Sequence, residues 1–227
     1  MTENLNQKIE NFFAKYPELK IKKGQTIIQP EEPLIYIYHL HSGYVKSFSL
    51  NDEGLELTIN IFKPNSFFPI TETLTGRTNT YFFEAMTDVV LRKAPTAKVH
   101  EFIKSDQEVL FDLTKRISSG LEGFMIRTQY LIRSNAEQKI SSSLLLMARR
   151  FGQNTPDRKV KILLPQTHED IANLAGVSRE TASLELKKLE NEGIIFSSKK
   201  IFIINDFQKL REISTIYLED QALSYGF

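Results

Sequence analysis

The chain has 227 residues, of which 41% are hydrophobic and 25% charged, a composition typical of a globular protein with one large or two modest domains. Because it contains no cysteine, disulfides, thiolate metal sites, cysteine-ligated iron–sulfur clusters and thiol nucleophiles are excluded. The net charge is only +1, but residues 134–211 carry 13 Lys and Arg against 9 Asp and Glu, which favours an anionic partner for this segment.

The N-terminal half predicts one helix followed by a β-rich domain. Residues 4–15 form an amphipathic pattern, with Leu5, Ile9, Phe12 and Phe13 on one face. Between Leu19 and Pro95, turn residues separate short runs rich in Ile, Tyr, Phe, Val and Thr. These runs are TIIQ, LIYIYHL, YVKSFSL, LELTINIF, TYFFEAM and VVLRKA. Regularly spaced short strands of this kind predict an antiparallel barrel or sandwich.

A long helix is predicted next, because the hydrophobic period changes to steps of three and four. It spans roughly 28 residues, and its stripe consists of Leu110, Leu113, Ile117, Leu121, Phe124, Thr128 and Leu131. A stripe of this length favours a partner helix, and a second copy of the chain supplies one with Leu113, Ile117 and Leu121 buried in the seam. The alternative is that the stripe packs only on its own barrel.

The segment that follows predicts a winged helix–turn–helix. Ser134-x-x-Glu137 is a capping-box pattern for a helix that ends at Gly152, and the polar loop GQNTPDRK then leads to a strand in VKILLP. Within Gln166–Ile195, Thr167 with Asp170 caps a first helix, Gly176 makes the turn and Ser178 caps a second helix that ends at Gly193. The run IIFSSKKIFII predicts a hairpin around Ser197–Lys200.

The second helix of this motif begins with Arg179 and Glu180, which suit the edges of DNA bases. Arginine binds guanine O6 and N7 with two hydrogen bonds, and glutamate accepts a hydrogen bond from cytosine N4. Ala172, four residues before Gly176, is the small residue that a close crossing of two helices requires. The alternative is that the pair is a solvated helix start, where the helix dipole favours glutamate.

The whole chain resembles the Crp/Fnr family of bacterial transcription regulators, most specifically in GVSRETASLELKKLENEGII and also in KKGQTIIQPEEPLIYIYHLHSGYVKSFSLNDEGLE. The resemblance implies an α+β fold with an N-terminal antiparallel β-roll (cyclic-nucleotide-binding-like), a long dimerisation helix and a C-terminal winged helix–turn–helix. The expected segments are the β-roll sensor domain 1–105, the dimerisation helix 106–133, the DNA-binding domain 134–207 and a helical tail 208–227.

The resemblance also implies partners and contacts. The protein is expected to bind an inverted-repeat site in double-stranded DNA as a homodimer, and to recruit or block RNA polymerase. The expected DNA contacts are Thr167 and His168 on the first helix, Ser178, Arg179, Glu180, Ser183, Leu184 and Lys187 on the second, and Lys199 and Lys200 on the wing.

The chain departs from the family at the positions that bind cyclic nucleotides. There the family's binders use Gly-Glu for the ribose and Arg followed by Ser or Thr for the phosphate, whereas this chain has Pro69-Ile70 and Asn79-Thr80. Arg77 is the one nearby cation, and the helix positions that meet the adenine are the apolar Phe124 and Met125. We therefore expect no control by cyclic nucleotides, and either an unknown small, largely apolar effector between the β-roll and the long helix or no effector.

A second departure lies in the DNA-reading helix. The family often has a further arginine five residues after the first, and this chain has Leu184 there. Leu184 is expected either to touch a thymine methyl group or, if the helix is slightly rolled, to turn into the core.

Other chemistry has little support in the sequence. His39 and His41 alternate on a strand, and together with His100 they leave open a haem- or metal-dependent sensor, the alternative being that His39 and His41 are histidines at the barrel edge. No catalytic motif is present, so we predict no enzymatic activity, no cofactor and no metal site. No apolar run approaches the roughly 18 residues of a membrane-spanning helix and the N-terminus is polar, which predicts a cytoplasmic protein.

Overall fold

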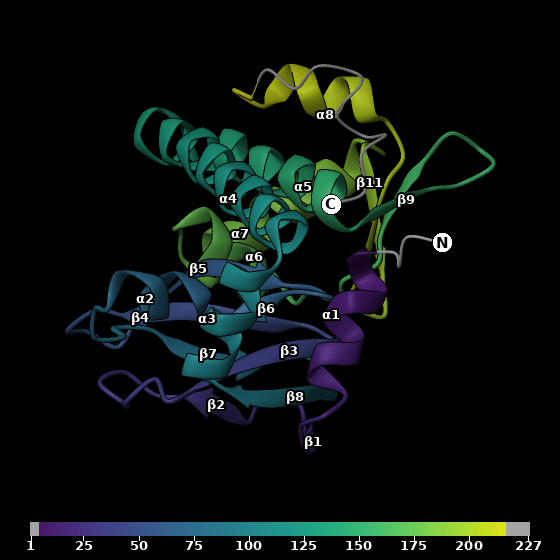
Figure 1. Ribbon diagram of the computed structural model, residues 1–227. Helices are drawn as coiled ribbons and strands as arrows, with labels where there is room; N and C mark the ends of the chain where they lie inside the picture. The colour runs from purple at the N-terminus through teal and green to yellow at the C-terminus, as the bar shows by residue number, and fades with distance from the viewer. Residues whose placement is uncertain (1–4, 217–227) are drawn as a thin grey trace. The chain divides into compact units, whose positions relative to one another are not determined.

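The computed structural model describes residues 5–216 and divides the chain into two compact units, one ending at Ser119 and the other beginning at Gly120 (Figure 1). The boundary falls within the long helix α4 (Gln107–Arg133, 27 residues). The fold is the predicted one: an antiparallel β-roll, a long helix and a winged helix–turn–helix.

The β-roll consists of two four-stranded antiparallel sheets. One has the order β1 (Glu18–Ile21), β8 (Val89–Pro95), β3 (Tyr36–Ser42), β6 (Phe67–Phe68), and the other β2 (Thr26–Ile28), β7 (Phe82–Ala85), β4 (Val45–Leu50), β5 (Glu56–Phe62). Each of the six predicted runs contains a strand. A core of inward-facing apolar residues holds the roll together: Ile28, Leu40, Val45, Phe68, Phe83, Ala85, Val89 and Leu91.

Helices cover a second core in the same unit. They are α1 (Leu5–Phe13), α2 (Ile70–Thr75), α3 (Thr96–Ser105) and the first part of α4. The buried residues are Ile9, Phe13, Ile37, Phe67, Ile70, Ala94, Val99, Ile103, Val109 and Leu113. The prediction that Leu113 faces a second copy of the chain is wrong, because Leu113 is 4% exposed and packs in this core of its own chain.

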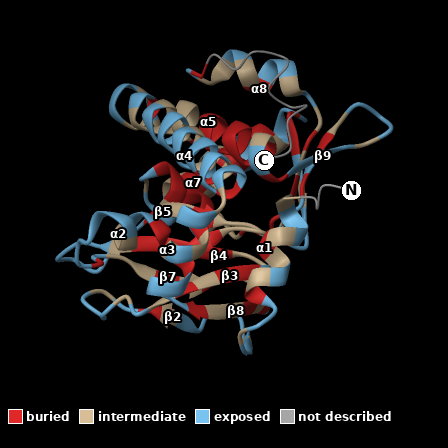
Figure 2. Ribbon diagram, viewed as in Figure 1, coloured by how far each residue is buried: buried red, intermediate tan, exposed pale blue. Residues whose placement is uncertain are grey.

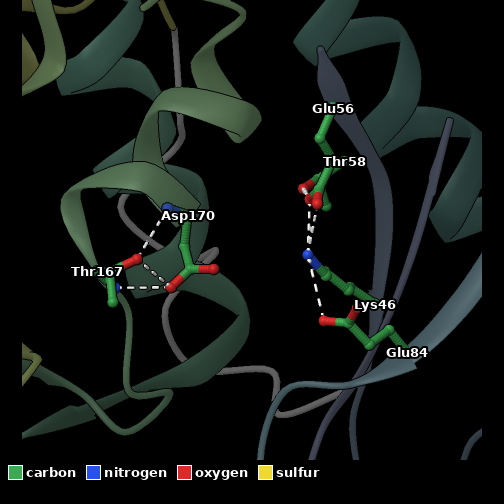
Figure 3. Close-up of polar contacts among 6 residues, drawn as sticks. All are labelled: Lys46, Glu56, Thr58, Glu84, Thr167 and Asp170. Carbon is green, nitrogen blue, oxygen red and sulfur yellow. Dashed lines mark hydrogen bonds and ion pairs between the residues drawn. The ribbon is translucent and has the colours of Figure 1, made fainter. Parts of the chain in front are cut away.

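An ion cluster on the second sheet joins three strands (Figure 3). Lys46 Nζ lies 2.8 and 2.7 Å from the two carboxylate oxygens of Glu56 and 3.5 Å from Oε1 of Glu84, and the Thr58 hydroxyl donates to Glu56 at 3.2 Å. Glu84 is directly across the ladder from Lys46 on β7, while Glu56 is on β5. Only 10% of the Lys46 side chain is exposed, and the two carboxylates offset the cost of its desolvation.

His39 lies inside the β-roll unit and not at a barrel edge. It is completely buried, whereas the side chain of His41 is 58% exposed. A β-bulge between Leu40 and Ser42 breaks the alternation of the strand, which is why the spacing of two did not predict this difference. The His39 ring stacks on Phe13 with the ring centroids 4.9 Å apart, and neither ring nitrogen has a hydrogen-bond partner among residues 5–216.

The second unit is built around α5 (Ala136–Phe151), in which nine consecutive residues from Ile140 to Ala148 are buried (Figure 2). Its capping box is formed by Asn135 and Gln138, so the expected box of Ser134 and Glu137 is wrong by one residue. The sheet has the order β11 (Ile195–Ser198), β12 (Ile201–Ile204), β10 (Val160–Ile162), β9 (Gly152–Asn154). The start of the expected polar loop is thus the strand β9, which pairs with β10.

Three further helices complete this unit: α6 (His168–Ala175), α7 (Arg179–Asn191) and α8 (Phe207–Ile213). The expected helical tail 208–227 coincides with α8 at its start, and residues 217–227 lie outside the described part of the chain. Within residues 5–216, no helix combines the length and apolarity that crossing a membrane requires.

Burial of His39 makes the β-roll unit sensitive to acid. Burial lowers the pKa of His39 from 6.5 to about 4; Glu10 opposes this shift, whereas His41, Arg116 and Arg92 add to it. Between these pH values the unfolded chain binds a proton that the folded chain does not bind. The stabilisation is therefore complete above about pH 6.5 and is lost as the pH falls towards 4, with a total of roughly 3 kcal/mol.

We expect urea unfolding to show a smaller loss of stability between pH 7 and pH 5 in His39→Leu than in the wild type. Leucine has a similar volume and no ionisable group. The exposed His41→Gln serves as the matched control and should retain the wild-type loss. Equal pH dependence in all three proteins would contradict the assignment.

Candidate DNA-binding site

Helix α6 begins and ends with well-formed caps. The Thr167 hydroxyl accepts a hydrogen bond from the Asp170 backbone N–H at 3.1 Å, and the Asp170 carboxylate accepts from the Thr167 N–H at 2.7 Å and from its hydroxyl at 2.7 Å (Figure 3). At the other end, Gly176 adopts a left-handed conformation with φ of 62° and donates its N–H to the carbonyl of Ala172. The predicted caps at Thr167 and Gly176 are thereby confirmed.

The packing of α6 on α7 determines which side of α7 faces outward. Ala172 is 1% exposed, and the buried residues of α7 are Ala182, Leu186 and Leu189. The Ser178 hydroxyl accepts from the Thr181 N–H at 3.2 Å and so starts α7 directly before the charged pair. Because the buried side of α7 is fixed, Arg179 and Glu180 are both exposed on the first turn.

Glu180 is poised to act as a hydrogen-bond acceptor. Its own backbone N–H at the helix start, the Ser178 hydroxyl and the nearby Arg179 hold the pKa of Glu180 below its usual 4.5. An ionised carboxylate accepts hydrogen bonds and donates none, which matches the amino group of cytosine and mismatches the acceptor groups of guanine.

Leu184 lies on the same outward face and is 71% exposed. The expectation that it turns into the core is therefore wrong, because Ala182, Leu186 and Leu189 occupy the buried side. Lys187 is also exposed on the outward side of the helix.

His168 and Ser183 form a contact that the sequence did not predict. Nδ1 of His168 lies 3.0 Å from the Ser183 hydroxyl, so the first residue of α6 is joined to the middle of α7. Both residues were expected to contact DNA individually. Because the two residues are 15 positions apart in the sequence and belong to different helices, no local sequence pattern could have predicted this contact.

The wing has an unusual turn. Lys199 and Lys200 connect β11 to β12 with φ of 50° and 67°, both left-handed, and both residues are exposed. This is the conformation of a two-residue type I′ hairpin, in which Asn-Gly is preferred. Held in this way, the two lysines project their charges at the tip of the wing.

A cleft of about 280 Å³ lies between the wing turn and the start of α6. Four of the predicted DNA-contact residues line this cleft: Thr167, His168, Lys199 and Lys200. The other lining residues were not predicted to contact DNA: Gln166, Ser197, Ser198 and Phe202. The backbone N–H of Gln166 donates to the Lys200 carbonyl at 2.7 Å, which fastens the wing to the helix–turn–helix. The Gln166 side chain is buried, a placement that no sequence pattern indicates.

The residues aligned with a cyclic-nucleotide site have mixed environments in the β-roll. Pro69 directly precedes α2, and Ile70 is part of the helix-covered core. Asn79 is completely buried and donates to the carbonyls of Gln29 and Tyr81 at 3.0 and 2.6 Å, while its own oxygen accepts from the Tyr81 N–H. Asn79 therefore braces the loop, and both hydrogens of its side-chain amide are bonded within the chain.

The remaining candidates of this kind are exposed. Arg77 and Thr80 are exposed on the loop after α2, and Phe124 and Met125 are 58% and 57% exposed on α4.

The histidines considered as haem or metal ligands have separate partners. His41 Nδ1 lies 3.5 Å from Glu10, and His100 Nε2 lies 3.3 Å from the Thr73 hydroxyl. Among residues 5–216, no group of three or more His, Asp or Glu side chains is arranged to hold a metal ion.

Comparisons with known proteins agree with this arrangement. A model of the cyclic nucleotide-binding domain matches residues 18–106 and a model of the Crp-like helix-turn-helix domain matches residues 138–213, together more than half of the chain. The transcriptional regulator SdrP of Thermus thermophilus is 29% identical over 201 residues, which cover 86% of this chain and 93% of that protein. The global nitrogen regulator of Synechocystis is 28% identical over 190 residues, which cover 81% and 82%.

A solved structure extends the comparison to three dimensions. The crystal structure of a CRP/FNR-family transcriptional regulator from Thermus thermophilus matches with a TM-score of 0.69 at 28% identity, and the match covers 87% of this chain and 97% of that one. The order of β-roll, long helix and winged helix–turn–helix that the sequence predicts is found in the fold, and the solved structure shares this fold over 87% of the chain. The chain belongs to the Crp/Fnr family of transcription regulators.

Proposed function

We propose that the protein is a homodimer whose two α7 helices read an inverted-repeat site in double-stranded DNA. The observation that carries the proposal is the exposed pair Arg179 and Glu180 on the first turn of a helix whose orientation is fixed by the buried crossing at Ala172. The N-terminal residues of a recognition helix meet the base edges in the major groove.

The proposed DNA contacts fall into two classes, those that read bases and those that bind phosphates. Arg179 reads guanine, and Glu180 reads cytosine as an acceptor. The lysines of the wing and the residues at the start of α6 bind phosphates, which supplies affinity without sequence preference. The cleft that brings Thr167 and His168 together with Lys199 and Lys200 supports this division, and the contact of His168 with Ser183 connects this group to the reading helix.

Arg179→Ala should weaken binding by about 1 to 3 kcal/mol per half-site and relax the preference at one base pair. Lys200→Gln should weaken binding to all sequences alike and lower the slope of log affinity against log salt by roughly 0.9 per phosphate contact. Titrations of labelled DNA over a series of salt concentrations measure both effects. Selected sites without two-fold symmetry would contradict the proposed dimeric reading.

Dimerisation is supported by an apolar stripe on α4 that its own chain leaves uncovered. The exposed apolar residues that follow one side of the helix are Leu110, Ile117, Leu121, Phe124, Met125 and Ile132. Exposed apolar side chains repeated along about six turns of helix are typical of a helix–helix seam. A pair of such helices is self-complementary, as a two-fold dimer requires.

Ile117→Glu should weaken the dimer about a hundredfold or more, because it places two like charges in an apolar seam. Ser119→Glu is the matched control: it adds the same charge two residues after Ile117 on the same helix, but about 160° away around the axis and opposite the stripe. Sedimentation at a series of protein concentrations measures the dissociation, and DNA affinity should fall with it since the two heads then bind separately. An Ile117→Glu protein that stays as dimeric as the control would refute the seam.

We propose further that the β-roll does not respond to cyclic nucleotides, and that any effector is a small, largely apolar molecule. A cyclic nucleotide carries a full negative charge, whose burial needs an opposing cation and free donors. The side-chain amide of Asn79 donates both of its hydrogens to the loop backbone, and Ile70 is packed in the core.

We also propose that the DNA-bound dimer acts on transcription through contact with RNA polymerase.

Cyclic AMP and cyclic GMP at millimolar concentration should leave the melting temperature and the DNA affinity unchanged. A ligand present at about 100 times its dissociation constant adds about 2.7 kcal/mol to stability, which corresponds to a rise of several degrees. Arg77 is the cation through which a phosphate would bind. A rise that is abolished by Arg77→Ala would overturn the prediction.

A further inference from the structure

Leu184 lies near the middle of the outward face of α7. Its side chain is 71% exposed, one turn after Glu180, while the helix buries Ala182, Leu186 and Leu189 on its other side. The other exposed residues of this helix are polar or charged, namely Arg179, Glu180, Lys187, Lys188 and Asn191. Leu184 is thus an apolar side chain on a helix face that is otherwise polar or charged, and it does not pack in the core.

Neighbouring contacts leave Leu184 accessible. Lys188, on the next turn, is held by Glu137 of α5, with Nζ and Oε1 2.8 Å apart. Ser183, the preceding residue, is held by His168 at 3.0 Å. Arg179 and Glu180 on the first turn of α7, Leu184 on the next turn and Lys187 after it face outward, and among these four only Leu184 has no hydrogen-bonding side chain.

The base edges offer one chemical match to this side chain. In the major groove, hydrogen-bond donors and acceptors distinguish the base pairs, and the only apolar group is the C5-methyl of thymine. Residues four apart on a helix are displaced by about 6 Å along the axis, which is close to two base-pair steps of about 3.4 Å. A helix that places Glu180 at a cytosine places Leu184 within about two base pairs of it.

On the basis of the proposed function, we propose that Leu184 is a specificity-determining residue that packs on the methyl group of a thymine in each half-site. It selects a T·A pair at the position where an arginine would select guanine. The discrimination comes from burying methyl surface and not from hydrogen bonds.

Replacing single thymines by uracil in a selected binding site tests this directly, because uracil lacks only the methyl group. With the full-length protein, one position per half-site should lose affinity about four-fold, and about fifteen-fold when both half-sites are changed, as expected for loss of one buried methyl group in each. Leu184→Ala should bind the thymine and uracil sites equally. Leu184→Met should retain the preference, because methionine is also apolar.

The matched control is Leu163→Ala, which truncates a leucine that is 42% exposed in the loop after β10 and should keep the wild-type ratio. Since Leu184 is exposed, the melting temperature of Leu184→Ala should equal that of the wild type. If the wild type selects an inverted repeat but no uracil substitution weakens binding, or if the loss persists in Leu184→Ala, the role of Leu184 is overturned and the proposed function stands. If no sequence is selected at all, the proposed function itself fails.

Discussion

Gly176 adopts a left-handed backbone that residues with a side chain rarely adopt, and the chain turns there from α6 into α7. The turn is held from two sides. Its N–H is bonded to Ala172, and the nearest atom to the place of a side chain is the Cδ2 of Leu131, 3.6 Å away on α4. A different turn would rotate α7 and move every residue on its outward face, so the reading geometry depends on this one conformation.

The second half of α4 is part of the same packed unit as the helix–turn–helix. The Arg127 guanidinium donates to the carbonyl of Leu174 near the end of α6 at 2.8 Å, and the hydroxyl of the buried Tyr130 lies 3.2 Å from that of Ser143 on α5. A cation at the C-terminal end of a helix is favoured by the helix dipole. The part of the apolar stripe from Leu121 to Ile132 therefore lies on a segment of α4 that is hydrogen-bonded directly to α6 and α5.

The sequence predicts most of the elements because each rests on local chemistry. Alternating β-branched and aromatic runs mark the strands, and Thr167, Gly176 and Ser178 mark the helix boundaries by cap preferences that act within a few residues. Asn135 was missed in favour of Ser134 because both residues are good caps and both are followed at the third position by a side chain that completes the box.

Features that depend on distant contacts could not be read from the sequence. The period of α4 shows that Leu113 is buried, but not whether the partner is its own chain or another. The difference in exposure between His39 and His41 follows from a bulge, and the roles of Asn79 and Gln166 follow from loops that meet only in the folded chain. The wing turn has a different consequence, because Lys199 and Lys200 occupy positions at which Asn-Gly would form a more stable hairpin. The proposed phosphate contacts give a reason for two lysines in a turn that they do not stabilise, and engineering this protein for thermal tolerance alone would favour their replacement.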